Sequence, residues 1–141
     1  MPRMVAAILL WTGALSFYDI RQRRLPNWLT LPGAAVVVIA AVAVGRGLPA
    51  ALGAAALAGV YLLVHLTVPA AMGAGDVKLA LGLGALTGCF GVDVWLLAAL
   101  GAPLLTAAVG LIAWFAWSAA TVPHGPSMCM ASAVALGLAV F

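Results

Sequence analysis

VWLLAALGAPLLTAAVGLIAWFAW, residues 94–117, is a long apolar run without a single charged residue. A helix needs about 20 predominantly apolar residues to cross a bilayer, so this run is long enough to span one. The whole chain of 141 residues has the same character, with 67% hydrophobic and 6% charged residues and a mean hydropathy of +1.25. Because soluble domains carry roughly 25% charged residues, the composition excludes a water-soluble fold. We predict an all-α, polytopic bundle of membrane helices.

Short breaks rich in glycine, proline or charge divide the rest of the chain into further apolar runs. The length allows about six transmembrane helices of about 20 residues each, so we expect residues 1–141 to form a single integral-membrane domain. The first run is interpreted as a retained span and not a signal peptide, because more arginines follow it than precede it. The small residues in segments 53–59 and 81–84 predict close helix contacts. The expected spans cover approximately residues 4–18, 28–44, 50–68, 76–86, 94–117 and 126–141.

The basic residues predict how the bundle is oriented. In a chain of six spans, loops one, three and five lie on the same side, and positively charged loops favour the cytoplasm. We therefore expect the N-terminus outside the inner membrane and loop 19–27 in the cytoplasm. Scattered through apolar sequence, the basic residues form no nucleic-acid footprint, so the expected partner is the lipid bilayer. The predicted cytoplasmic side holds Arg21, Arg23, Arg24 and Lys78, and the other side holds Arg3 and Arg46.

The chain has only three acidic residues, all aspartates, and two of them stand at the ends of apolar runs. Asp19 follows the first run, and Asp76 begins the fourth in the stretch Gly73-Ala-Gly-Asp-Val-Lys78. Each has a plain structural explanation, since Asp19 can pair with Arg23 or Arg24 in a loop and Asp76 can cap a helix. Ionisable groups at a membrane boundary are costly, however, and both aspartates are expected at the same depth. Together they suggest a catalytic pair.

Two adjacent carboxylates can hydrolyse a peptide bond without a metal ion or a cofactor. At a separation of about 3–5 Å both cannot easily ionise, so one keeps a proton. The ionised carboxylate acts as general base on a water molecule, and the protonated one donates to the scissile carbonyl oxygen. No metal site is predicted elsewhere, because Cys89 and Cys129 are isolated and form no Cys-x-x-Cys pair.

Three blocks follow one another along the chain: residues 19–30 (DIRQRRLPNWLT), 73–79 (GAGDVKL) and 122–126 (VPHGP). Together they resemble the type IV prepilin peptidases, which are membrane aspartyl proteases of the Gly-x-Gly-Asp type. The closer likeness is to the short members that process tight-adherence (Flp-type) prepilins or archaeal preflagellins. Long members carry an insert with two Cys-x-x-Cys pairs and also methylate the new N-terminus, and this sequence lacks that insert. His124 stands where the family more often has an aromatic residue.

The resemblance implies a membrane-embedded aspartic endopeptidase that removes the short leader peptide from type IV (Flp-like) prepilin precursors. Cleavage would follow a glycine at the cytoplasmic face of the inner membrane, with no cofactor. Asp19 and Asp76 would be the catalytic pair. The supporting residues of the active-site loop and helix ends would be Gly73, Gly75, Lys78, Pro26, Asn27, Pro123, Gly125 and Pro126.

The residues alone leave two other functions open, a small proton- or cation-coupled carrier and a structural membrane subunit. A carrier site tends to lie near the bilayer midplane, whereas both aspartates are expected at one face. His65, near the end of the third run, fits either a buried, hydrogen-bonded histidine or a proton relay, and we favour the first.

Overall fold

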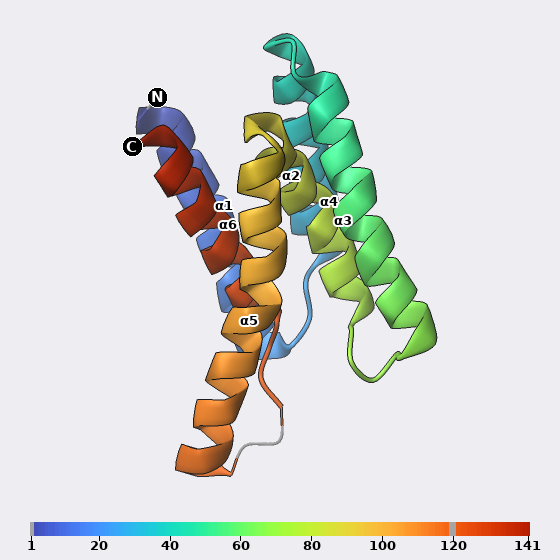
Figure 1. The fold of residues 1–141 in the computed structure, drawn as a ribbon, viewed down its shortest axis with the longest axis vertical. Helices are drawn as coiled ribbons and strands as arrows, with labels where there is room; N and C mark the ends of the chain where they lie inside the picture. The colour runs from blue at the N-terminus through green and yellow to red at the C-terminus, as the bar shows by residue number, and fades with distance from the viewer. Residues whose placement is uncertain (1, 119–120) are drawn as a thin grey trace.

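The computed structural model describes residues 2–118 and 121–141, and this part of the chain is built of helices and loops without a strand. The predicted all-α bundle of six helices is confirmed. The helices are α1 (Pro2–Gln22), α2 (Asn27–Ala43), α3 (Gly47–Thr67), α4 (Ala74–Phe90), α5 (Val92–Trp117) and α6 (Gly125–Val140) (Figure 1).

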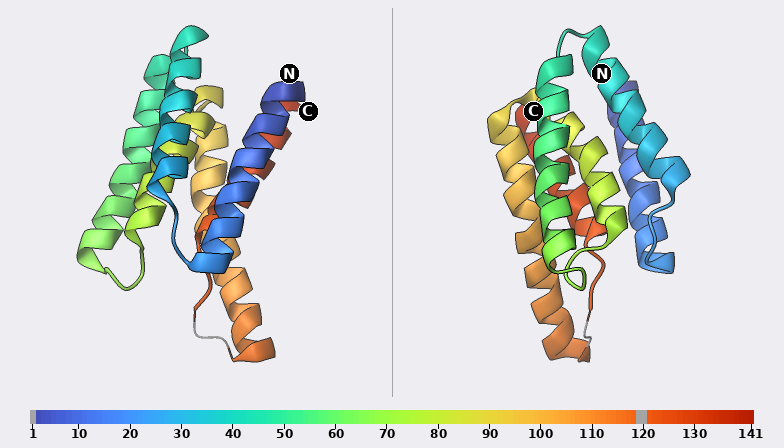
Figure 2. Two further views of the ribbon diagram at one scale, coloured as in Figure 1. Left: turned by 180° about the vertical axis from the view of Figure 1, so that it is seen from behind. Right: turned by 90° about the vertical axis from the view of Figure 1, so that its right-hand side faces the viewer.

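The helices run up and down, so their ends gather at two opposite ends of the bundle. Both termini lie at one end, together with the turn between α2 and α3 (Figure 1). The other end collects the last turns of α1, α3 and α5 and the first turns of α2 and α4 (Figure 2). The connections expected on one side of the membrane therefore do lie together. That this end faces the cytoplasm stays a prediction.

Three helices, α1, α3 and α5, are long and apolar enough to cross a membrane. Helices α2 and α6 are apolar but shorter. Large apolar side chains are exposed along these helices, including Leu10, Ile39, Leu63 and Leu104. Exposed apolar side chains on this scale suit a lipid environment and not water. The fold is that of a membrane protein.

Several helices extend beyond the predicted spans. α1 continues to Gln22, so Asp19 lies in a helix and not in the loop expected from residue 19 onward. α3 begins at Gly47 because proline is tolerated in a first turn, where Pro49 lies. α4 continues to Phe90 through Gly88, where the predicted span had already ended. The predicted spans end where the apolar runs end. Backbone hydrogen bonding does not depend on apolar side chains, so the helices continue beyond these runs.

α4 is the central helix of the bundle. It packs against α2, α3, α5 and α6, and nine of its residues are buried. Its contact with α3 is made backbone to backbone, since a Cβ added at Gly84 would collide with the carbonyl oxygen of Gly53. The predicted small-residue contact is thus confirmed for these two glycines, whereas nothing lies within 4 Å of a Cβ at Gly59. α1 reaches this core through Trp11, whose ring lies against Gly82.

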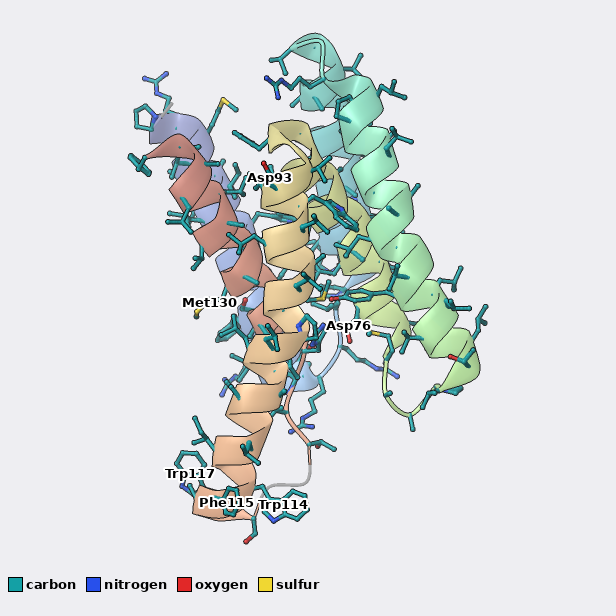
Figure 3. All side chains as sticks on the ribbon, viewed as in Figure 1. Asp76, Asp93, Trp114, Phe115, Trp117 and Met130 are labelled. Carbon is teal, nitrogen blue, oxygen red and sulfur yellow. The ribbon has the colours of Figure 1, made fainter. Side chains whose placement is uncertain are left out.

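α5 extends beyond the other helices at the end of the bundle where Asp19 and Asp76 lie (Figure 1). Its last turns carry Trp114, Phe115 and Trp117, which are 69%, 82% and 76% exposed. Figure 3 shows these three side chains at the tip of the helix, away from the rest of the bundle. α6 begins well above this tip, because His124, the residue before it, contacts Thr106 in the middle of α5.

Candidate active site

Asp19 lies in the last turn of α1 and is held by the start of α6. Its side chain is buried, and its Oδ2 atom accepts a hydrogen bond of 2.9 Å from the backbone N–H of Gly125. The first turn of a helix has unpaired N–H groups and a positive end, so a carboxylate is stabilised there. A Cβ at position 125 would collide with Oδ2 of Asp19, so a side chain there would displace the carboxylate. The third sequence block thus supplies the partner of the first aspartate.

Asp76 lies in the first turn of α4, behind the two glycines of its motif. Gly73 is the N-cap, in an extended conformation with φ −76° and ψ 150°, and its carbonyl accepts the N–H of Asp76 at 3.2 Å. The expectation that Asp76 itself caps the helix is wrong, because the helix already begins at Ala74. The side chain of Asp76 is half-buried and lines a cavity at this end of the bundle.

The two aspartates line one cavity of about 660 Å³. The other residues that line the cavity come from the α1–α2 connection and from the start of α4. They are Gln22, Arg23, Arg24, Leu25, Pro26, Asn27, Gly73, Ala74, Gly75 and Lys78.

Contacts between the three sequence blocks close this end of the bundle. Lys78 donates a hydrogen bond of 2.7 Å from Nζ to Oδ1 of Asn27, and Gly75 packs against Leu25. The guanidinium of Arg23 donates a hydrogen bond of 2.6 Å to Oγ1 of Thr121, the residue just before the third block. Arg23 therefore turns toward Thr121, and Asp19 has a backbone partner in place of the expected arginine.

Most of the predicted supporting residues lie at this site. Gly73, Gly75, Lys78, Pro26 and Asn27 line the cavity, and Gly125 binds Asp19. The two prolines of the third block have another place. Pro123 lies in the segment before α6, and Pro126 lies in its first turn, where proline is well tolerated.

Both histidines are hydrogen-bonded near the site. Nδ1 of His65 lies 2.6 Å from the carbonyl oxygen of Met72 and ties α3 to the loop that leads into Gly73. His65 is thus the hydrogen-bonded histidine that was favoured over a proton relay. His124 contacts Tyr61 and Thr106, two residues that the sequence analysis missed. Both stand in apolar helices without a motif, and only the fold brings them to His124.

No metal site accompanies these residues in the described chain. Among residues 2–118 and 121–141, no three His, Cys, Asp or Glu side chains are grouped so that they could hold a metal ion.

Comparison with known families places the chain. A model of the type IV leader peptidase family matches residues 6–141. The chain belongs to this family. No curated protein and no solved structure gives a significant match. As a type IV leader peptidase it is a protease of the prepilin-peptidase type, and the resemblance inferred from its three sequence blocks is confirmed.

Proposed function

We propose that the protein is a membrane-embedded aspartic endopeptidase that removes the short leader from Flp-like type IV prepilins. The observation that carries the proposal is the shared cavity, because Asp19 and Asp76 line it from two different helices. Leader removal at the cytoplasmic face of the inner membrane follows from the predicted orientation, in which the arginine-containing loop lies inside.

In the proposed reaction the two carboxylates share one proton. The ionised one takes a proton from a water molecule, and the resulting hydroxide attacks the scissile carbonyl carbon. The protonated one donates its proton to the carbonyl oxygen, which gives a tetrahedral intermediate. The proton held by the first carboxylate then passes to the leaving nitrogen as the C–N bond breaks, while the second carboxylate takes back a proton from one hydroxyl of the intermediate. A carboxylic acid and an amine are released, and the pair again shares one proton. The N–H of Gly125 donates to Oδ2 of Asp19 and holds this carboxylate in place for the exchange.

The cavity lining supports binding of an extended peptide backbone. Gly73 and Gly75 form part of its wall and add no side chain, so a peptide can approach the backbone of this segment closely. The apolar helix of a prepilin precursor would then lie in the bilayer while its leader stays in the cytoplasm. Cleavage of an Flp-type prepilin in the test below would show that the precursor is Flp-like.

The test is co-expression with an Flp-type prepilin, followed by mass spectrometry of the pilin. The variants are Asp19→Asn and Asp76→Asn, with Asp93→Asn as the matched control. Asp93 is the third aspartate of the chain and lies in the first turn of α5, at the opposite end of the bundle (Figure 3). We expect the wild type and Asp93→Asn to remove the leader and the other two variants to leave the precursor intact.

Two results would contradict the proposal. Cleavage that survives Asp76→Asn would rule out the two-aspartate mechanism. If a folded wild-type protein cleaves none of several such precursors, Flp-like prepilins are not its substrate. An extra methyl mass on the mature pilin would reveal a second activity.

A further inference from the structure

His124 is bonded at both of its ring nitrogens to two different helices. Nε2 lies 3.0 Å from the hydroxyl of Tyr61 on α3, and Nδ1 lies within hydrogen-bonding distance of Oγ1 of Thr106 on α5. The rings of Tyr61 and His124 also meet edge to face, with centroids 5.6 Å apart. The ring therefore joins α3 and α5 at the point where α6 begins.

The neighbouring bonds fix which nitrogen carries the proton. Oγ1 of Thr106 already donates its hydrogen to the carbonyl oxygen of Ala102 at 3.0 Å, so it can only accept from His124. Nδ1 must then carry the hydrogen, and Nε2 accepts the O–H of Tyr61. Burial lowers the pKa of His124, which favours the neutral ring that this arrangement requires. The side chain is thus held as the neutral Nδ1–H tautomer.

The backbone of His124 leads directly to Asp19. The peptide unit between His124 and Gly125 is bonded at both ends. Its N–H, from Gly125, donates to Oδ2 of Asp19 at 2.9 Å, and its carbonyl, from His124, accepts the N–H of Met128 at 3.1 Å. A rotation of this peptide would therefore move the backbone N–H that donates to Asp19. The ring bonds of His124 oppose that rotation.

The same group of side chains is connected to the bundle core around the second aspartate's helix. Tyr61 is buried at 6% exposure on α3, and α3 packs against α4, which carries Asp76. The chain of contacts thus runs from α3 through Tyr61 and His124 to Gly125 and Asp19.

We infer that His124 is a positioning residue for the aspartate pair. Through its two ring hydrogen bonds it orients the 124–125 peptide, and this peptide sets the direction of the Asp19 carboxylate relative to Asp76. The inference rests on the proposed function, since it assumes that this pair is the reacting one. It assigns to this chain's histidine a role that a phenyl ring at the same position could not fill.

The experiment compares His124→Phe with the wild type in the prepilin cleavage assay. Phenylalanine keeps the aromatic volume but loses both ring bonds, so we expect kcat to fall about tenfold while KM stays unchanged. Thr106→Val removes one of the two bonds and should lower kcat by about threefold. Its matched control is Thr87→Val, because Thr87 also donates to the carbonyl four residues before it but has no contact with His124. We expect Thr87→Val to cleave like the wild type.

A second readout needs no substrate and separates this inference from the proposed function. ¹⁵N spectra of the two histidines should show the neutral Nδ1–H form for His124, with its signals identified by their loss in His124→Phe. The ¹³C carboxyl signal of Asp19 should shift in His124→Phe and stay in place in Thr87→Val. An Nε2–H or charged ring, or an Asp19 signal that does not move, would overturn the inference even if the wild type cleaves prepilin. Unchanged kcat in folded His124→Phe would overturn it as well.

Discussion

The two helices that carry the aspartates are packed very differently. α4, with Asp76, is surrounded by α2, α3, α5 and α6, and nine of its residues are buried. α1, with Asp19, packs mainly against α6 and α2 and buries only Thr12, Leu15 and Asp19 itself. The position of Asp76 is therefore set by backbone packing, whereas the orientation of Asp19 depends on the peptide at Gly125.

The difference follows from the residues available on each helix. Glycines at 53, 84 and 88 let the backbones of α3 and α4 approach until atoms of one helix touch the backbone of the other. In membranes, where apolar side chains gain little by leaving lipid, such close packing is what holds helices together. α1 exposes Leu10, Phe17 and Ile20, and its own glycine, Gly13, has nothing within 4 Å of an added Cβ.

The sharpest test of this comparison is Gly125→Ala. The added methyl group collides with Oδ2 of Asp19 and displaces the carboxylate. Because a misplacement of about 1 Å can cost about a hundredfold in rate, we expect prepilin cleavage to fall by about that factor, with the protein still folded. Gly137→Ala is the control, since it changes the same helix and nothing lies within 4 Å of its Cβ. Equal activity of the two variants would show that Asp19 does not depend on this contact.

The packing of α4 can be broken in a corresponding way by Gly84→Ala. Its Cβ collides with the carbonyl oxygen of Gly53, and we expect a loss of about 1–3 kcal/mol in the free energy of unfolding, as for other overpacked sites. Thermal or denaturant unfolding in detergent measures the change. The control Gly59→Ala has free space around its Cβ and should be neutral or slightly stabilising. A neutral Gly84→Ala would mean that the two helices can separate without cost.

A smaller effect is expected where α1 is attached to the core. Nε1 of Trp11 donates to the carbonyl oxygen of Leu29 on α2 at 2.9 Å. Trp11→Phe removes this bond and should cost about 0.5–1.5 kcal/mol of stability. Trp114→Phe is the control, because Trp114 is exposed at the tip of α5. If both variants unfold alike, α1 is held by something other than this bond.

The smallest effect is predicted for Lys78→Met. The bond from Lys78 to Asn27 lies at the exposed edge of the cavity, where such interactions contribute about 1 kcal/mol or less. Cleavage should fall by no more than about fivefold, measured as kcat/KM for the prepilin. A loss as large as that of Asp76→Asn would instead give the ammonium group a direct part in the reaction.

The sequence was sufficient to predict the helices and to place the two aspartates at one end of the bundle. It was not sufficient to predict the contacts that orient these aspartates. Apolar runs predicted six helices, and their alternation placed Asp19 and Asp76 at the same end of the bundle. The bond between Gly125 and Asp19 joins residues that are far apart along the chain, and no local pattern reports it. Tyr61 and Thr106 could not be predicted for the same reason. Helix ends were missed where charged residues at 19–22 remain helical and where Gly88 packs against α3.

The length of α5 sets the reaction back from the tip of the molecule. Between Thr106, beside the start of α6, and Trp117 at the tip, α5 advances by about three turns, or roughly 16 Å. Each turnover consumes one water molecule, and the polar lining of the cavity, which includes Arg24 and Lys78, provides a path for that water to Asp19 and Asp76.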